Sequence, residues 1–438
     1  MILFSSGSEH HNLTADDLRR GLNEALGKLG PKNKVLVIPP DITRLHSRAG
    51  ELTRMAFDYF GEQISDILPA LGTHKPMNSS ELDSMFPGVP KELFRIHDWR
   101  KGVVRIGEVP SGFIARVSDG ALSYSLPVEL NRLIWEGGHD LILSVGQVVP
   151  HEVIGMANYN KNLLIGCGGS EIINKSHFLG AVFGMERIMG IAENPVRQVL
   201  NYASGHFLSH LPILYVLTVL SSPGKQEFGS PVPDTRYPIP DTPTLITRGL
   251  YIGTSEDVFL AAAELSAKVN NTILDKPLQK VVVYLDAGEY RSTWLGNKSI
   301  YRTRMAIADG GELIVLAPGV REFGEDREID RLIRKYGYHG TPATLDAVDR
   351  NEDLQNNLSA AAHLIHGSSE GRFRITYCPG ALTREEIESA GYDFGKIESM
   401  VDLYHPDDLT NGFNRNRNGE EFYFISNPAT GLWAGKKI

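Results

Sequence analysis

The chain has 438 residues, a length that predicts two or three domains at about 100–200 residues each. Its formal net charge of −9 argues against a nucleic-acid-binding protein, because such proteins carry a basic footprint. Its two cysteines, Cys167 and Cys378, are too few for a disulfide framework and lack the CxxC partners of a thiolate metal site.

The sequence contains no segment typical of a membrane protein or of a targeting peptide. Its first residues form neither a basic region followed by an apolar run nor a transit peptide. The longest apolar run, Leu211 to Leu220, is much shorter than the roughly 18 residues of a membrane-spanning helix. We therefore expect a cytoplasmic protein that has no membrane partner.

Short apolar and β-branched runs alternate with helical patterns along the chain. Runs of this kind are typical of strands buried on both faces of a parallel sheet. The predicted strands cover residues 34–38, 140–145, 280–285, 312–316 and 374–377. The predicted helices cover residues 15–29, 258–269 and 328–336. This alternation predicts an α/β fold of two domains with mainly parallel central sheets, and an active site in the cleft between them.

A proline-rich segment, Ser221–Pro243, is the best candidate for an inter-domain connection. The prediction is a cofactor-binding α/β domain over residues 1–248 and a second α/β domain over residues 249–420. Residues from about 421 to 438 are candidates to pack back on the first domain.

Titratable residues follow the predicted strands of the first domain. Asp41-Ile42-Thr43-Arg44 comes after the first of them, Gly72-Thr73-His74-Lys75-Pro76 after an apolar run, and His151 after a third strand. Lys161 and His177 follow. Each also has an ordinary structural interpretation: a turn aspartate paired with its neighbouring arginine, an exposed loop histidine, a solvated turn lysine, a histidine at a helix end.

The order and spacing of these residues, taken together, resemble the nickel-pincer lactate racemase family. Lys161 follows His151 by ten residues and His177 follows Lys161 by sixteen. Asn194-Pro195-Val196-Arg197 is similar to the family's Asn-Pro-x-Arg segment. Gly249–Val269, Ser299-Ile300-Tyr301 and Gly310–Val315 resemble further segments of that family.

The resemblance implies a cofactor, a reaction and a set of site residues. The cofactor is a nickel-bearing pyridinium mononucleotide with a thioamide and a thioacid. The reaction moves hydride to and from this cofactor and so racemises or epimerises a 2-hydroxy acid. The implied roles are covalent tether for Lys161, nickel ligand for His177, acid/base pair for His74 and His151, and cofactor or substrate contacts for Asp41, Thr43 and Arg44.

Several positions depart from the family pattern. Asn158-Tyr159-Asn160 stands where the family has a Gly-Gly-Arg turn before the tether, although Gly168 and Gly169 could supply backbone N–H groups. Arg302 and Arg304 stand near a family Gln and Lys, and Asn356 lies where an aromatic wall is expected. These changes predict a longer, polar substrate, such as a sugar acid or a malate-like dicarboxylate, rather than lactate.

Two other functions fit the same residues. Asp41, His74, His151 and His177 could ligate zinc or manganese in a hard-metal enzyme that acts on a sugar acid or an ester, without any need for Lys161. The chain could also be a family member that binds a ligand without catalysis. His206 and His210 share a helical face but lack a zincin carboxylate, and the role of His46 stays open.

The expected partners are a hydroxy acid substrate and the enzymes that make the cofactor, and a homodimer is one assembly that the sequence allows. Dedicated enzymes synthesise this cofactor, so a recombinant host that lacks them is expected to yield protein without it.

Overall fold

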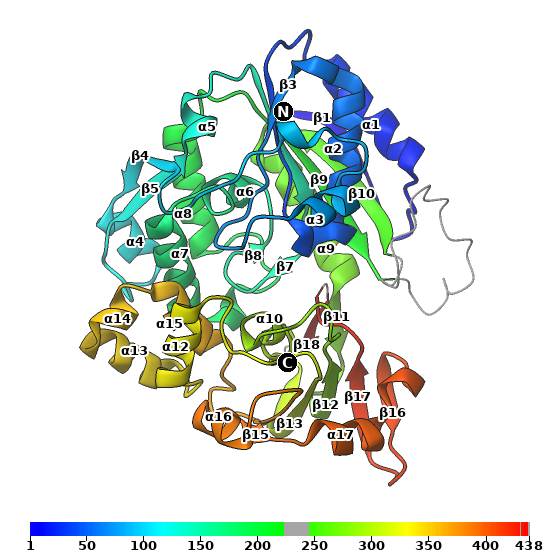
Figure 1. The fold of residues 1–438 in the computed structure, drawn as a ribbon, viewed down its shortest axis with the longest axis vertical. Helices are drawn as coiled ribbons and strands as arrows, with labels where there is room; N and C mark the ends of the chain where they lie inside the picture. The colour runs from blue at the N-terminus through cyan, green and yellow to red at the C-terminus, as the bar shows by residue number, and fades with distance from the viewer. Residues whose placement is uncertain (223–244, 430, 437–438) are drawn as a thin grey trace. The chain divides into compact units, whose positions relative to one another are not determined.

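The computed structural model describes residues 1–222, 245–429 and 431–436, so the predicted linker lies almost entirely outside the described residues. The chain forms two compact units, one of Met1–Ser176 and Met189–Asn270, the other of His177–Ile188 and Asn271–Ile438. Each unit contains a six-stranded sheet with helices packed on it (Figure 1). The predicted fold class, α/β with mainly parallel central sheets, is confirmed.

The sheet of the first unit has the strand order β1-β10-β9-β6-β2-β3. Neighbouring strands from β9 to β3 are parallel, whereas β1 and β10 join one edge in antiparallel pairs. The strands are β1 (Ile2–Gly7), β2 (Val35–Ile38), β3 (Ile64–Ile67), β6 (Leu141–Gln147), β9 (Ile213–Ser221) and β10 (Ile246–Gly253). Every residue of β2, β6 and β9 is buried, as their continuous apolar sequences predict.

Helices α1 and α2 cover one face of this sheet, where leucine, valine and isoleucine side chains from helices and strands form one continuous core. A reciprocal cap starts α1, because the Asp17 N–H donates to Thr14 Oγ1 and the Thr14 N–H donates to the Asp17 carboxylate. The helices of this unit are α1 (Ala15–Gly27), α2 (Ala49–Phe60), α3 (Ser79–Met85), α4 (Ser111–Val117), α5 (Arg132–Glu136), α6 (Asn160–Leu164), α8 (Pro195–Ala203) and α9 (Glu256–Asn270).

The other face of the sheet is aromatic near β9. Tyr215 alternates with Leu214 and Val216, which belong to the α1–α2 core, and therefore faces the opposite side. Its ring lies 4.4 Å from that of Tyr159, which stacks on Phe259 of α9 at 5.3 Å. This aromatic cluster supports the loop that precedes α6.

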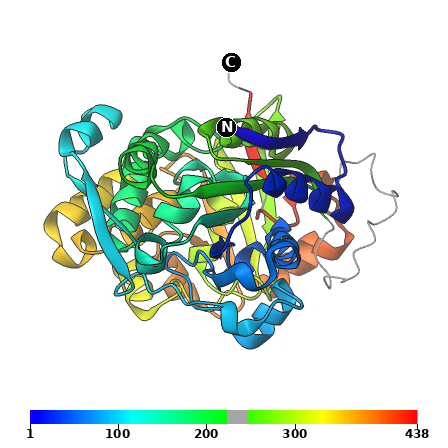
Figure 2. The same cartoon turned by 90° about the horizontal axis from the view of Figure 1, so that it is seen from above.

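Two short hairpins complete the first unit. β4 (Val103–Val109) pairs with β5 (Leu126–Asn131) as an arm whose tip carries α4 (Figure 2). β7 (Pro150–His151) pairs with β8 (Gly155–Met156) directly after β6. Short 3₁₀ turns are η1 (Ile42–Ser47), η2 (Gly61–Gln63) and η3 (Lys91–Leu93), and η5 (Ser204–Leu208) is a π turn.

The sheet of the second unit has the order β15-β14-β13-β12-β17-β16, with only β16 antiparallel to its neighbour. Its strands are β12 (Leu278–Tyr284), β13 (Ile307–Ala317), β14 (Arg374–Pro379), β15 (Asp393–Phe394), β16 (Gly412–Arg415) and β17 (Glu421–Ile425). β11 (Asn271–Leu274) and β18 (Leu432–Gly435) form a separate parallel pair.

Helix α17 closes one face of the second sheet over an apolar core. The helices of this unit are α10 (Thr293–Gly296), α11 (Lys298–Tyr301), α12 (Arg327–Tyr336), α13 (Thr341–Arg350), α14 (Glu352–Gln355), α15 (Leu358–His366), α16 (Arg384–Ser389) and α17 (Ile397–Tyr404), with η4 (Met185–Arg187) and η6 (Pro406–Asp408) as 3₁₀ turns. Among the described helices, none combines the length and the apolar character that crossing a membrane requires.

The division between the units differs from the boundary that the sequence suggested at residues 248/249. That boundary falls inside β10, which pairs with both β1 and β9 in the first sheet, and α9 packs on β9 and β10. The first unit therefore continues to Asn270. Residues 421–438 also differ from expectation, since β17 pairs with β12 and β18 with β11 in the second unit.

Candidate functional site

Three adjacent parallel strands of the first sheet, β6, β2 and β3, end at the same edge. Asp41 follows β2, His74 follows β3, and His151 follows β6. Ligands of open α/β sheets bind outside the carboxyl ends of the strands, so this edge is where chemistry is expected.

Asp41 and His74 form a hydrogen-bonded pair. His74 Nδ1 donates to Asp41 Oδ2 over 2.6 Å, and Thr43 Oγ1 donates to Asp41 Oδ1 over 2.6 Å. The Asp41 side chain is 5% exposed and that of His74 is 38% exposed. Burial alone would raise the pKa of the Asp41 carboxyl, but His74, Thr43 and Arg44 together hold it below its usual range. The pair leaves His74 Nε2 as the nitrogen that can exchange a proton.

His151 has the opposite hydrogen-bonding state. The backbone N–H of Val153 donates to His151 Nδ1 over 3.2 Å, so this nitrogen accepts and the neutral ring carries its proton on Nε2. The Glu152 carboxylate lies 3.6 Å from the same nitrogen, too far for a hydrogen bond, and stabilises the ring mainly when it is protonated. Neutral His74 therefore presents an acceptor at Nε2, whereas neutral His151 presents a donor there.

Lys161 lies in the first turn of α6, a few residues after the β7–β8 hairpin. Its pKa is lowered to about 8 by burial and by the nearby Arg44 guanidinium, against the opposing effect of Glu152 and Asp41. A lysine with this pKa has a substantial neutral fraction near neutral pH, and the neutral amine is the form that acylation requires.

The Asn158-Tyr159-Asn160 turn before Lys161 adopts a backbone that glycine usually supplies. Asn158 has φ 68° and Tyr159 has φ 61°, both in the left-handed region. The turn therefore adopts, without glycine, the positive φ angles that glycine favours.

The glycine pair before α7 (Ser170–Phe183) does not form an open anion cradle. The Gly168 N–H donates to Ile165 O over 3.3 Å. The carboxylate of Glu129 accepts from the Glu171 N–H over 3.1 Å in the first turn of α7. A carboxylate thus already stabilises this helix N-terminus, where the sequence suggested a cofactor contact.

His177 lies on α7, in the part that belongs to the second unit, and is half-buried. Over the described ranges, no group of three or more His, Cys, Asp and Glu side chains is placed to hold a metal ion. His206 stacks on Tyr202 at 3.9 Å, and His210 lies against Trp135 at 5.0 Å.

The predicted substrate residues of the second unit have structural partners. Arg302 is 1% exposed and donates to Gly431 O over 2.9 Å. Arg304, 3% exposed, forms an ion pair with Glu186 at 2.6 Å and donates to Ser368 O. Asn356 is exposed at the end of α14.

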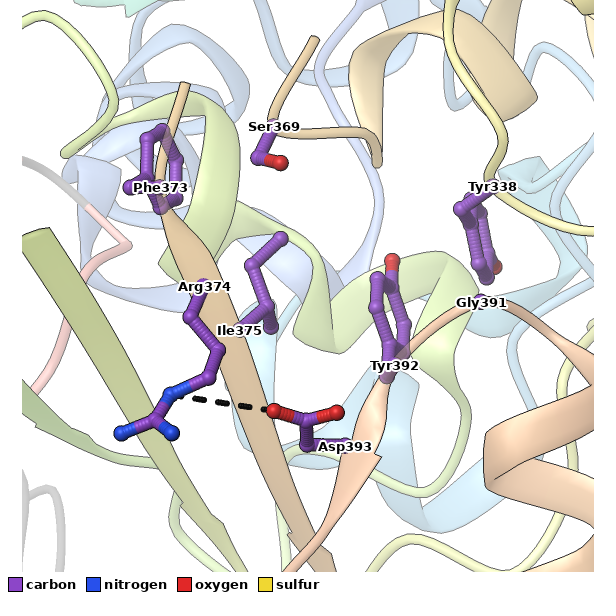
Figure 3. Close-up of a pocket in the computed structure, with 8 residues that line it drawn as sticks. All are labelled: Tyr338, Ser369, Phe373, Arg374, Ile375, Gly391, Tyr392 and Asp393. Atoms are coloured by element: carbon purple, nitrogen blue, oxygen red, sulfur yellow. Dashed lines mark ion pairs between the residues drawn. The ribbon is translucent and has the colours of Figure 1, made fainter. Parts of the chain in front are cut away.

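A surface pocket of about 130 Å³ also lies in the second unit. Figure 3 shows Arg374 and Asp393 on one side and the rings of Tyr338 and Tyr392 on the other. The Arg374 Nε–Asp393 Oδ2 distance is 3.7 Å, and Arg374 also pairs with Glu312. The pocket lies where β14 begins, not at the carboxyl ends of the strands, and its charges are already paired.

Sequence reasoning gave no role to two buried side chains near the site. Gln147, the last residue of β6, is 4% exposed, and neither of its amide atoms has a hydrogen-bond partner within the described part of the chain. Arg197 of α8 is 1% exposed. Its Asn-Pro-x-Arg segment was noticed, but the sequence could not show what the guanidinium contacts.

A known family model matches the part of the chain that contains this site. Residues 18–188, which include Asp41, His74, His151, Lys161 and His177, match the lactate racemase N-terminal domain.

Solved structures share the fold of this chain over nearly its whole length. A Thermotoga maritima protein aligns with a TM-score of 0.78 at 22% identity, covering 98% of this chain and 100% of its own. The lactate racemase apoprotein from Thermoanaerobacterium thermosaccharolyticum aligns with a TM-score of 0.68 at 18% identity, covering 99% of this chain and 94% of its own. No curated protein matches the chain.

Proposed function

We propose that the chain is a racemase or epimerase of a 2-hydroxy acid that uses a nickel-pincer nucleotide attached to Lys161. The observation that carries this proposal is the combination, at one edge of the first sheet, of the Asp41–His74 pair, the oppositely bonded His151 and a lysine with a pKa of about 8. The matched N-terminal domain contains all of them.

The residues present fit the cofactor in one testable respect. A thioamide link requires a neutral, nucleophilic amine, and burial with Arg44 supplies it at Lys161. His177 would provide the imidazole ligand to nickel, whose preference for soft donors and imidazole suits such a site. When bound, the cofactor would accept hydride from the substrate carbon and return it.

The two histidines would move the hydroxyl proton. His74 Nε2, unprotonated in the neutral ring, would take it from a substrate of one configuration. The protonated ring of His151, stabilised by the Glu152 carboxylate, would deliver a proton from Nε2 on the opposite side and become neutral, and the roles would reverse for the other configuration. Asp41 would keep the His74 ring in one orientation and stabilise its protonated form. Arg44 is suited to hold the substrate carboxylate in a bidentate pair.

The substrate we propose is a longer, polar 2-hydroxy acid rather than lactate. Asn356 stands where the family pattern has a large aromatic side chain, and an amide can bind hydroxyl groups that such a ring would exclude. Gluconate-like sugar acids and malate are the compounds to compare with lactate.

The test is intact mass and nickel content after co-expression with the cofactor-synthesis enzymes. We expect a covalent adduct on Lys161, about one nickel per chain, and interconversion of stereoisomers of at least one 2-hydroxy acid. Lys161→Ala should lose the adduct and the activity, whereas Lys268→Ala, an exposed lysine of α9 paired with Glu264, should keep both. An unmodified Lys161 in the co-expressed protein, or full activity in Lys161→Ala, would overturn the proposal.

A further inference from the structure

Arg197 binds the loop that leads to Lys161 from the inside of the first unit. It lies in the first turn of α8, where its backbone N–H donates to the Asn194 cap over 3.0 Å. Its guanidinium Nη2 donates to Met156 O over 2.6 Å, and both terminal nitrogens lie 3.4 Å from Asn158 O. Nη1 also donates to the side-chain oxygen of Asn160. One side chain therefore binds three positions within the five residues before Lys161.

The backbone of that loop needs such support. Asn158 and Tyr159 both have positive φ, a conformation that costs non-glycine residues roughly 1–3 kcal/mol and persists only when the surroundings enforce it. The guanidinium binds the carbonyl of Asn158, between these two residues, and lies 4.1 Å from the ring of Phe259, on which Tyr159 stacks. The same cation thus contacts both the backbone of the turn and its aromatic support.

A second connection fixes the residue next to Lys161. Asn160 Nδ2 donates to Asn201 Oδ1 over 2.7 Å, and Asn201 Nδ2 donates to the Glu256 carboxylate of α9. Asn160 is completely buried, so its side chain links Arg197 to Asn201 inside the protein. The backbone next to Lys161 is therefore held by hydrogen bonds to α8, and α8 is in turn hydrogen-bonded to α9.

Packing alone does not explain a buried arginine at this position. Burial lowers the pKa of Arg197 to about 9, and its Nε has no hydrogen-bond partner among the described residues. The groups that its terminal nitrogens bind are carbonyl oxygens, which do not neutralise its charge. An apolar side chain of similar volume would often be as stable or more stable in such a place. Because burying this charge is costly, the hydrogen bonds from the guanidinium to the loop are the better explanation for an arginine here.

We propose that Arg197 is a positioning residue that holds the Met156–Asn160 turn so that Lys161 presents its amine, partly shielded from solvent, for attachment of the cofactor. Asn201 completes the arrangement through Asn160. The purpose assigned to Lys161 rests on the proposed function, but its environment can be measured without the cofactor.

The charged groups near Lys161 define what each variant changes. Burial is the main cause of the lowered pKa of Lys161. Among the charged groups, Arg44 on η1 and, to a smaller extent, Arg197 on α8 also lower it, whereas Glu152 after β7 and Asp41 before η1 raise it. Arg197→Met removes both the charge and the guanidinium donors. Arg197→Lys keeps the positive charge but loses the two guanidinium donors. Asn201→Leu leaves Arg197 intact and removes the hydrogen bonds of Asn201 to Asn160 and to Glu256.

The experiment is competitive acetylation of protein produced without the cofactor-synthesis enzymes. Trace acetic anhydride acylates neutral amines with loss of acetate, and peptide mass spectrometry compares Lys161 with the exposed Lys268 between pH 6 and 10. In the unchanged protein, Lys161 should reach half-maximal labelling near pH 8. Arg197→Met should shift the profile to higher pH and reduce relative labelling at pH 7 by about tenfold, the change for one pKa unit. The shift in Arg197→Lys should lie between those of the unchanged protein and Arg197→Met, and the shift in Asn201→Leu should be the smallest.

Arg248→Met is the matched control. Arg248 is also buried in the first unit, but it donates to Ser221 Oγ and to His11 O. We expect a lower melting temperature and an unchanged Lys161 profile. An unchanged profile in folded Arg197→Met, or an equal shift in Arg248→Met, would overturn the proposal. Should Arg197→Met not fold, Arg197→Lys and Asn201→Leu carry the test, and unchanged profiles in both would overturn it. These outcomes do not depend on whether the co-expressed protein carries an adduct.

Discussion

The two sheets of this protein have similar architectures, but their polar residues differ in where they lie and in what they are paired with. In the first unit, Asp41, His74 and His151 follow the carboxyl ends of three adjacent strands, and His74 keeps a partly exposed ring. In the second, the Asp286 carboxylate after β12 accepts from the Gly288 and Glu289 N–H groups in an ordinary turn. Arg304, deeper in the unit, is paired with Glu186.

The difference indicates which polar residues lie where a ligand of the sheet would bind. His74 has one ring nitrogen paired with Asp41 and a partly exposed ring, so it can exchange protons. A buried arginine that donates to carbonyl oxygens and to a carboxylate stabilises its own unit instead. Residue type therefore indicates function only together with the hydrogen bonds that the side chain already makes.

Removing either histidine should produce the largest effect. His74→Ala and His151→Ala should each lower turnover of the cofactor-loaded protein by about 10²–10⁴-fold, the usual contribution of a positioned acid or base. Chiral chromatography of the 2-hydroxy acid measures the rate, and intact mass confirms that Lys161 still carries its adduct. Losses below tenfold in both variants would remove the histidines from the acid/base role.

Removing Arg304 should affect stability and not chemistry. Arg304→Met loses its donation to Ser368 O and its ion pair, which we expect to lower the free energy of unfolding by about 1–3 kcal/mol. The loss should stay in this range because Glu186, 39% exposed, can be hydrated again. Urea denaturation measures the change. An unaltered midpoint together with a raised KM would instead place Arg304 in contact with substrate and weaken the contrast between the units.

The smallest expected effect is the acid dependence of the Asp41–His74 pair. The pKa of Asp41 is lowered on folding, so its stabilisation is complete above the unfolded value of roughly 3.9 and is lost as pH falls through the lower folded value. We expect the pair to contribute up to about 1 kcal/mol to the free energy of unfolding, because His74 is more than a third exposed and water screens the pair. The difference in unfolding free energy between Asp41→Asn and the unchanged protein should therefore stay constant above about pH 5 and shrink as the pH falls below about 4. A difference that is constant with pH would contradict this assignment.

The sequence predicted the local elements well because their signals are local. The apolar runs at residues 34–38 and 374–377 became β2 and β14, and the periodic segment at 328–336 became α12. The antiparallel edge strand β1 was missed, since six residues at the start of the chain show no pattern until β10 pairs with them.

The candidate site was predicted in part. The residues that follow β2, β3 and β6 could be selected because strand ends are visible in sequence. The contacts of Arg197 could not, since they join α8 to a loop 37 to 41 positions earlier and use carbonyl oxygens that carry no sequence signal. The partners of Arg302 and Arg304 were hidden for the same reason: Gly431 and Glu186 are distant in sequence.

Helix α7 has a consequence for how the protein folds. Residues His177–Ile188 belong to the second unit although the first unit resumes after them and continues from Met189 to Asn270. Ala181 packs with Ala362 and Ile365, and Glu186 pairs with Arg304. The first unit is thus interrupted by a piece of the second, and neither unit is a contiguous stretch of chain. A fragment that ends at Asn270 would carry this segment without its partners, and a fragment that begins at Asn271 would lack it. We therefore expect that neither unit folds stably when it is expressed without the other.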